Sequence, residues 1–241
     1  MKAIRIELSQ QTANYKVETS YALKHSYPLP TYSAVIGMVH AACGFTDYHP
    51  MKVSIQGKSA SSHVDINTAY FFGGGEYEEP EPGKRARHQL KVKRYKKSGY
   101  IGITKGLSNT QILNDVELIL HIIPEDKEDY ETILTGLKDP KVFLSLGRHE
   151  DLVRIDSVKE VDLQLLEDDP EFGFYGCAYI PLKNVDEIIR GTVYKINKEF
   201  SYDKKGHRVW NTIVDVVYSN QETGLNDIYE DQENQNLAVF A

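Results

Sequence analysis

The chain has 241 residues, of which 41% are hydrophobic, and a formal net charge of −7 at pH 7. This length allows one elaborated domain or two small ones, and no uninterrupted apolar run approaches the ~20 residues that span a bilayer. Cys43 and Cys177 lie far apart and outside any CxxC pattern, so we expect reduced thiols and neither a disulfide nor a metal site. The N-terminus alternates charged and apolar residues, unlike a signal peptide, and we expect a cytoplasmic protein without membrane contact.

The N-terminal part of the chain predicts a strand followed by a buried helix. Apolar and charged residues alternate over Lys2–Leu8, as in a half-buried strand, whereas Ser9–Lys24 is polar and predicts a loop or an irregular edge. After two prolines, Ala34–Cys43 is apolar nearly all round, which predicts a helix that is buried. Ser33 is the expected N-cap, and Gly44 is the expected residue just past the helix end.

Further strands and a second helix follow. Met51–Ser59 has a strand pattern, and Val64–Phe72 predicts a strand outside the core repeat. Val116–Ile123 is the clearest strand, Asp126–Lys138 has apolar residues at helical spacing, and Val142–Leu146 predicts a short strand. Without the insertion between the second and third of the core strands, the order of elements is βαββαβ, which is the ferredoxin-like order. The sheet of this fold is also the platform of RNA-recognition (RRM-like) modules.

Strands dominate the remainder of the chain. Tyr175–Ile180 predicts a strand, Val185–Arg190 a short helical turn, and Thr192–Tyr202 with His207–Tyr218 a second hairpin. Trp210, the only tryptophan, is expected to anchor this β-rich half rather than to bind a base.

The expected fold class is therefore α+β, in three parts. Residues 1–150 form the ferredoxin-like domain with an inserted basic β-hairpin thumb at about 84–105, and residues 151–218 form a β-rich C-terminal region. Residues 219–241 are acidic and rich in amides at their start, a composition typical of a mobile tail.

The inserted segment opposes the charge of the rest of the protein. Between residues 84 and 105 there is no Asp or Glu, and nine cations leave a formal charge of −16 for the remainder. Tyr95, Tyr100 and His88 are interleaved with them. Cations and rings together suit single-stranded nucleic acid, although an acidic partner or open water would offset the same charge. The cations of this segment are Lys84, Arg85, Arg87, Lys91, Lys93, Arg94, Lys96, Lys97 and Lys105.

A second candidate site lies at Tyr27–Met38, YPLPTYSAVIGM. A helix N-terminus carries unsatisfied N–H groups that can hold a phosphate, while Thr31 and Ser33 add hydroxyls and Tyr32 adds a ring. The alternative is that Ser33 only caps the helix, and the pattern does not decide between the two.

No nucleotide-binding loop, metalloprotease motif or serine-hydrolase elbow is present, and no cofactor is expected. His88, beside Arg87 and Lys91, and His149 have the residue types that metal-independent RNA cleavage requires. Nothing in the sequence supplies a partnered acid, so binding is favoured over catalysis.

Three features together resemble the Cas-five family of CRISPR-associated proteins. They are YPLPTYSAVIGMVHAACG after an N-terminal strand, a basic hairpin inserted in a ferredoxin-like order, and FLSLGRHEDLVRI at Phe143–Ile155. The resemblance is to the RAMP group, and most of all to type I-B members. It implies a Cascade subunit that caps the 5′ handle of the CRISPR RNA (crRNA). It also implies contacts with the backbone and large subunits, and with target DNA only indirectly.

The resemblance also implies roles for particular residues. The inserted hairpin resembles the family's thumb, which lies against RNA near the handle–spacer junction, and Arg148 in the LGR turn is a further candidate. Type I-C relatives also cut the precursor RNA, but no complete catalytic set matches here. Two alternatives stay open: a metal-independent endoribonuclease that processes repeat RNA, and a protein-interaction module that docks on an acidic partner. The residues carried over are Tyr32 and Ser33 near the handle and Lys91, Lys93, Arg94, Lys96 and Lys97 on the thumb.

Overall fold

The computed structural model describes the chain except residues 22, 73–74, 86, 95–97 and 168–169. In chain order its elements are β1 (Lys2–Ala13), β2 (Tyr15–Lys16), β3 (Leu23–Lys24), β4 (Ser26–Tyr27), α1 (Tyr32–Cys43), β5 (Met51–Phe71), β6 (Leu90–Lys93), β7 (Tyr100–Pro124), α2 (Asp129–Lys138), β8 (Arg154–Leu165), β9 (Cys177–Pro181), the 3₁₀ turn η1 (Leu182–Asn184), β10 (Thr192–Tyr202), β11 (Arg208–Ser219), β12 (Tyr229–Asp231) and β13 (Leu237–Ala238).

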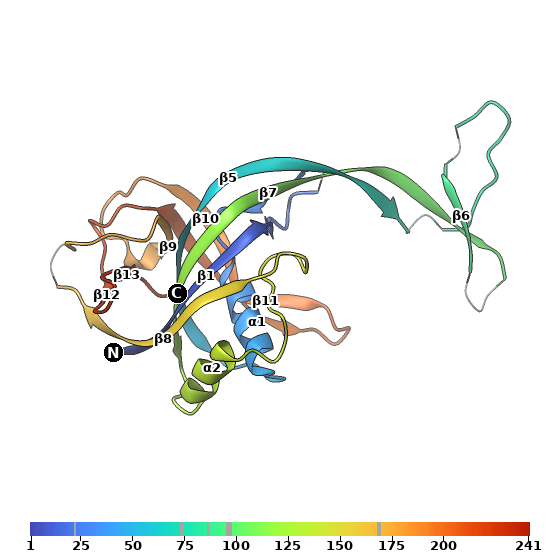
Figure 1. The fold of residues 1–241 in the computed structure, drawn as a ribbon. Helices are drawn as coiled ribbons and strands as arrows, with labels where there is room; N and C mark the ends of the chain where they lie inside the picture. Colours follow the sequence, from blue (N-terminus) through green and yellow to red (C-terminus); the bar gives the residue numbers. More distant parts are fainter. Residues whose placement is uncertain (22, 73–74, 86, 95–97, 168–169) are drawn as a thin grey trace.

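One large, curled sheet organises the molecule (Figure 1). Its strand order is β10-β11-β9-β5-β7-β1-β8-β12-β13, with β3 and β6 pairing separately with β7. The middle strands β5-β7-β1-β8 are antiparallel to their neighbours. Helix α1 connects β1 to β5, and α2 connects β7 to β8. The predicted α+β class is confirmed. Residue 150 does not interrupt the sheet, because β8 pairs with β1 and β9 with β5.

The main core lies between this sheet and the two helices. Ile4, Ile6 and Leu8 alternate along β1 and are buried together with the apolar side chains of α1 and α2. Each such side chain stabilises the fold by roughly 1.5–3 kcal/mol relative to an exposed one. The predicted core helix is confirmed as α1, and Gly44 follows it with φ +69°. The N-cap is Thr31 rather than Ser33, since the Thr31 hydroxyl accepts the Ala34 N–H at 3.2 Å.

Two strand predictions and one helix prediction were wrong. The segments at 51–59 and 64–72 are parts of a single strand, β5, because β7 pairs with it without a register shift from Met51 to Phe71. Val142–Leu146 is a loop with one isolated bridge, and the strand after α2 is β8. The helical turn expected at Val185–Arg190 lies earlier, at η1. The second predicted hairpin is confirmed as β10 and β11.

The C-terminal segment is packed against the body, so the predicted mobile tail at 219–241 was also wrong. Its strand β12 pairs with β8, and its last residues, from Leu237 onward, are buried. A buried charge cluster holds it: Asp231 accepts hydrogen bonds from Arg5 on β1 at 2.7 Å and from His121 on β7 at 3.1 Å. All three side chains are buried.

These contacts set the protonation of the cluster. Burial raises the pKa of the Asp231 carboxyl, but hydrogen bonds from His121, the Glu233 N–H and Arg5 outweigh this effect and hold the pKa below its usual range. Burial also lowers the pKa of His121. Asp231 is therefore a buried carboxylate whose charge the fold depends on.

Strands β5 and β7 continue beyond the body as a two-stranded ribbon (Figure 1). We call residues 60–71 and 104–115 the arm, and residues 75–103 at its far end the tip. The last five pairs of the arm, from Asn67–Ser108 to Phe71–Thr104, lie beyond the pairing of β3 with Asn109 and Thr110. The inserted basic segment is thus carried away from the body on paired strands.

Replacing Asp231 by Asn should lower the free energy of unfolding by roughly 3 kcal/mol, because Arg5 and His121 lose their buried carboxylate and Arg5 keeps only the partly exposed Glu7 and Glu233. A depressed carboxyl pKa stabilises the fold above the unfolded value of ~3.9, so the difference from wild type should shrink as pH falls below it. Denaturant titrations at several pH values measure both effects. The matched control is Asp156→Asn, in the exposed pair with Arg154, which should cost about 1 kcal/mol or less. Equal losses of unfolding free energy in the two variants would contradict the role of Asp231 as a buried carboxylate on which the fold depends.

Candidate nucleic-acid interface

The tip is a small hairpin built on the end of β7. Leu90 pairs with Ile103 and Lys93 with Tyr100, so the predicted basic hairpin is present as β6 and the first residues of β7. Tyr95, Lys96 and Lys97, three of the candidate RNA-binding residues, lie outside the described residues. Tyr100 is exposed at the start of β7.

His88 lies inside the tip rather than on its surface. Its side chain is 2% exposed and packs on Gly102, where an added Cβ would come within 2.2 Å of the ring. The Tyr77 ring lies 6.1 Å away, and the Glu78 N–H points at His88 Nδ1 at 3.5 Å. The imidazole therefore fills the centre of the tip. Its predicted roles in RNA contact or cleavage have no support from this position.

Four cations of the tip are paired with a strip of glutamates that precedes them. Lys91 Nζ lies 2.6 Å from Glu79 and also over the rings of Tyr77 and Tyr100, at 4.8 and 4.7 Å. The hydrogen bond that Lys91 donates to Glu79 raises the pKa of Lys91. Exposed pairs of this kind stabilise little, about 0–1 kcal/mol each, so a phosphate can replace the carboxylate. The other pairs are Arg87–Glu78 at 2.9 Å, Lys84–Glu81 at 2.6 Å and Arg94–Glu76 at 3.6 Å.

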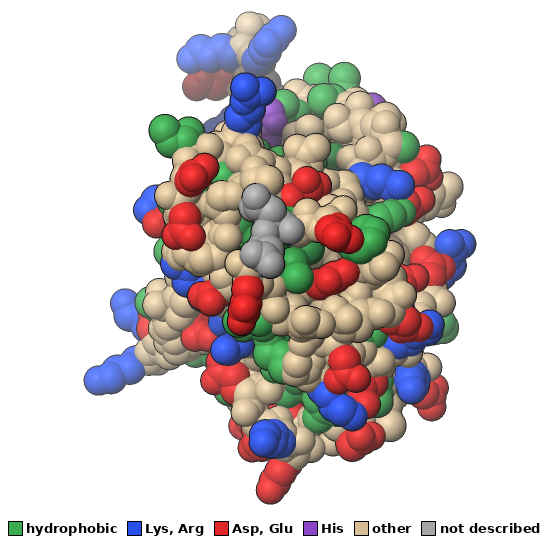
Figure 2. All heavy atoms as spheres, turned by 90° about the vertical axis from the view of Figure 1, so that its left-hand side faces the viewer, with side chains coloured by type: hydrophobic (Ala, Val, Ile, Leu, Met, Phe, Trp, Pro, Cys, Tyr) green, Lys and Arg blue, Asp and Glu red, His purple; other side chains and the backbone are tan. Residues whose placement is uncertain are grey.

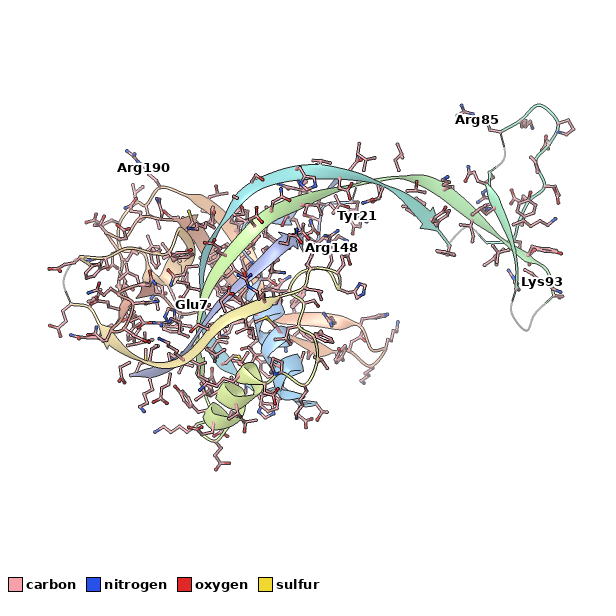
Figure 3. The ribbon with its side chains drawn as sticks, in the orientation of Figure 1. Glu7, Tyr21, Arg85, Lys93, Arg148 and Arg190 are labelled. Atoms are coloured by element: carbon pink, nitrogen blue, oxygen red, sulfur yellow. The ribbon has the colours of Figure 1, made fainter. Side chains whose placement is uncertain are left out.

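The tip keeps an excess of positive charge despite these pairs. The eight Lys and Arg of the tip and its four glutamates leave it a net charge of +4, and Lys105 at the outer end of the arm adds one more positive charge. Within the described part of the chain, Arg85, Lys93 and Lys105 have no carboxylate partner. Figure 3 shows Arg85 and Lys93 at the tip, far from the body.

Acidic side chains are scattered over the face of the body turned away from the arm (Figure 2). Asp and Glu are spread widely over this face, and the cations on it do not gather into a patch. A polyanion is therefore repelled here and attracted at the tip.

The LGR turn is held by one buried carboxylate, that of Asp151. It accepts the Asn14 N–H at 2.9 Å and the Arg148 N–H at 2.8 Å, and Arg148 Nη2 lies 2.6 Å from its other oxygen. This hydrogen bond raises the pKa of Arg148. Gly147 has φ +107°, and an added Cβ there would meet the Asn14 oxygen at 2.9 Å. Arg148 is thus a positioned, partly exposed cation at the base of the arm (Figure 3). His149, beside it, is exposed and approaches Glu150 at 3.3 Å.

A groove passes this turn on the side from which the arm leaves. It joins two hollows of about 260 and 390 Å³ that share Lys16 and Gly147. Lys16, Lys24 and Arg208 have no carboxylate partner among the described residues, which gives the groove a surplus of positive charge. The first hollow is lined by Tyr15, Lys16, Glu18, Tyr27, Thr31, Ser33, Ala34, Gly147, Asn197, Phe200, Arg208 and Trp210. The second is lined by Asn14, Lys16, Lys24, Asn67, Thr110, Gly147, Arg148 and Glu150.

The structure separates the two candidate residues of the proline–helix motif. Ser33 lines the groove, and its hydroxyl lies 3.0 Å from that of Thr31. Tyr32 is fully buried, 6.2 Å from the ring of Tyr179, and burial raises its pKa. Tyr179 also donates a hydrogen bond to the Leu29 carbonyl at 2.8 Å, which fixes the proline-rich entry to α1. Tyr32 is a core residue in this structure.

Sequence reasoning missed Lys16, Lys24, Arg208 and the position of Trp210. These residues meet Ser33 and Gly147 only because β2, β3, α1, the LGR turn and β11 come together in the folded body. The one available signal was that Trp210 is the sole tryptophan and stands two residues after the last cation of the chain.

Comparison with known families gives a match along nearly the whole chain. The model described as "CRISPR-associated protein (Cas_Cas5)" matches residues 3–227. The chain belongs to this Cas-five family. Comparison with curated proteins gives no significant match.

Three solved structures are similar to this chain over most of its length. One described as "CRISPR RNA-guided surveillance complex" is 18% identical with a TM-score of 0.52, covering 91% of this chain and 90% of that one. Another, "Crystal structure of Cas protein", has 13% identity, a TM-score of 0.43 and coverage of 94% and 98%. A third, from Archaeoglobus fulgidus, is titled as a CRISPR protein and has 9% identity, a TM-score of 0.44 and coverage of 99% and 98%. The first supports a shared fold. Among the described helices, none is long and apolar enough to cross a membrane.

Replacing Gly102 by Ala should open the tip, because the added Cβ clashes with the His88 ring and overpacking costs ~1–3 kcal/mol. Tryptic cleavage within the tip should then speed up about 5- to 100-fold if cleavage follows the open population. Timed digestion with mass spectrometry measures this rate. Gly37→Ala is the control, since nothing lies within 4 Å of its added Cβ. Unchanged cleavage in Gly102→Ala would show that the packing of His88 does not hold the tip.

Proposed function

We propose that this Cas-five protein is a crRNA-binding subunit of a type I Cascade surveillance complex in the cytoplasm, where it caps the 5′ handle and helps to assemble the backbone. The observation that carries the proposal is a tip of net charge +4, held by the arm away from an otherwise acidic body. Phosphate contacts supply most of the affinity for RNA, and cations held on paired strands make such contacts at fixed spacing.

The groove extends the proposed path of RNA from the arm to the body. Arg148 and Lys24 line it at the base of the arm, next to Asn67 and Thr110 of the arm itself. A single-stranded RNA that leaves the tip therefore meets further cations on the way to Ser33 and the start of α1. This path supports the handle-side role that the family resemblance implies for Ser33, and it supports Arg148 as a further RNA contact.

We also propose that β1, α1, β5, β7, α2 and β8 form a ferredoxin-like unit. The chain order of these elements, the sheet order β8-β1-β7-β5 and the antiparallel pairing of neighbours support this assignment. The last strand of the unit is then β8 instead of the segment before the LGR turn.

One face of the arm supports the contacts with other Cascade subunits. Constant register places a row of apolar side chains on the same face of the ribbon, and each is 49–77% exposed. Exposed apolar surface of this kind marks protein interfaces more often than RNA contacts. We propose that this apolar stripe docks on a backbone or large subunit of the complex, which differs from the alternative in which the basic hairpin itself docks on an acidic partner. The stripe consists of Val64, Ile66, Tyr70 and Leu107.

Replacing Arg85 and Lys93 by Ala should weaken binding of single-stranded RNA and reduce its salt dependence. Each lost phosphate contact reduces the log–log slope of affinity against salt by roughly 0.7. Binding of purified protein at several salt concentrations measures the slope. The control removes two cations away from the arm, Arg190 and Lys127, and should leave the slope unchanged; Figure 3 shows Arg190 on the other side of the body. If the tip variant and the wild type have equal log–log slopes of affinity against salt, Arg85 and Lys93 do not contact phosphates.

Replacing Ile66 and Leu107 by Lys should release this subunit from the complex, because charges cannot be buried against an apolar partner surface. The purified variant should still bind RNA, since neither residue belongs to the tip or the groove. Co-purification of complex subunits from the native host measures the first effect, and RNA binding measures the second. Ile188→Lys is the control, at an apolar residue that is 99% exposed elsewhere. Full recovery of partner subunits with the arm variant would contradict docking through the stripe.

A further inference from the structure

The end of the groove farthest from the arm is an aromatic pocket on the β10–β11 hairpin. The rings of Phe200 and Trp210 meet edge to face with centroids 5.8 Å apart. The guanidinium of Arg208 lies over the Phe200 ring at 4.6 Å. Together they line one side of the hollow of about 260 Å³. We call this hollow the hairpin pocket.

The hairpin pocket is also lined by polar and charged groups. The hydroxyls of Thr31 and Ser33 are among them, and Lys16 adds a second cation to Arg208. Glu18, the acidic residue of the pocket, already accepts a hydrogen bond from Asn197 at 2.8 Å. The pocket thus combines π-faces, hydroxyls and two cations that no described carboxylate neutralises.

Trp210 is poorly placed to serve as a core anchor. It is only half-buried, whereas an anchoring ring in this region, that of Tyr179, is fully buried. Its only described ring contact is the edge of Phe200, and no described residue accepts a hydrogen bond from its indole N–H. The expectation that Trp210 only stabilises the β-rich half therefore does not account for its position.

We propose that the hairpin pocket binds one nucleotide of single-stranded RNA, with the base stacked on Trp210 and the phosphate between Arg208 and Lys16. This inference rests on the proposed RNA-binding function and adds a base-stacking site on the body. Aromatic faces accept any base, because every base has a π-face, and Arg guanidinium planes contribute in the same way. The hydroxyls of Thr31 and Ser33 then face the sugar, where they can pair with ribose oxygens.

The chain itself supplies the probe, because Trp210 is its only tryptophan. A base that stacks on this ring quenches its fluorescence, whereas RNA bound elsewhere does not contact it. The test titrates the full-length protein with single-stranded RNA of about 10 nucleotides, a length within the range of such sites, and follows both affinity and tryptophan emission. Saturable quenching that follows binding is the expected result.

Variants separate stacking from folding. Trp210→Leu should lose about 5- to 100-fold in affinity, which corresponds to ~1–3 kcal/mol for one stacked base, and Trp210→Phe should keep most of it. Phe143→Leu is the control, since this exposed ring lies outside the pocket. Unfolding curves check that each variant is folded. The quenching test uses the wild-type protein alone, so its result does not depend on whether a variant folds.

The outcomes distinguish this inference from the function on which it rests. RNA binding without quenching, or with equal affinity in Trp210→Leu, would overturn the nucleotide pocket and leave the RNA-binding function standing. Failure of the wild-type protein to bind RNA at any salt concentration would overturn both. Quenching together with weaker binding in Trp210→Leu, but not in Phe143→Leu, supports the pocket.

Discussion

The pairing of β5 with β7 is the constraint on which the rest of this structure depends. Its inner part forms the centre of the sheet, and its outer part is the arm. Opposite charges on the tip and the body attract each other, and a flexible basic loop would fold back onto the acidic surface. Five residue pairs of free ribbon, ~17 Å at the usual strand rise, exceed the ~8 Å over which salt screens charges. The tip therefore keeps its charge available to a ligand.

The distribution of charge divides the surface into regions with different tasks. The glutamates at the start of the tip hold its cations in place without neutralising them all, and the acidic face of the body repels a polyanion. In the proposed function, the tip and the groove attract RNA, and the apolar stripe of the arm is the surface that contacts a protein partner. An RNA strand that follows this distribution of charge runs from the tip, past Arg148, to the start of α1.

Local patterns in the sequence identified most of the elements, and long-range contacts explain most of the errors. Helices α1 and α2 and the two hairpins have periodicity and turn residues that act over short distances. The docking of residues 219–241 depends on Asp231 meeting Arg5, 226 residues away, and composition alone suggests a mobile tail. The same limit applies to the site. The basic segment was evident, but the burial of His88 and Tyr32 depends on Gly102 and Tyr179. The groove, in turn, requires segments that are adjacent only after folding.

Photocrosslinking tests the central claim most directly. The native complex would be prepared with 4-thiouridine in its RNA, irradiated, and digested to map the crosslinked peptides of this subunit. The account predicts crosslinks in the peptides of residues 84–105 and in those around Ser33 and Trp210. Crosslinks confined to the acidic face opposite the arm, or an absence of crosslinks to this subunit, would contradict it.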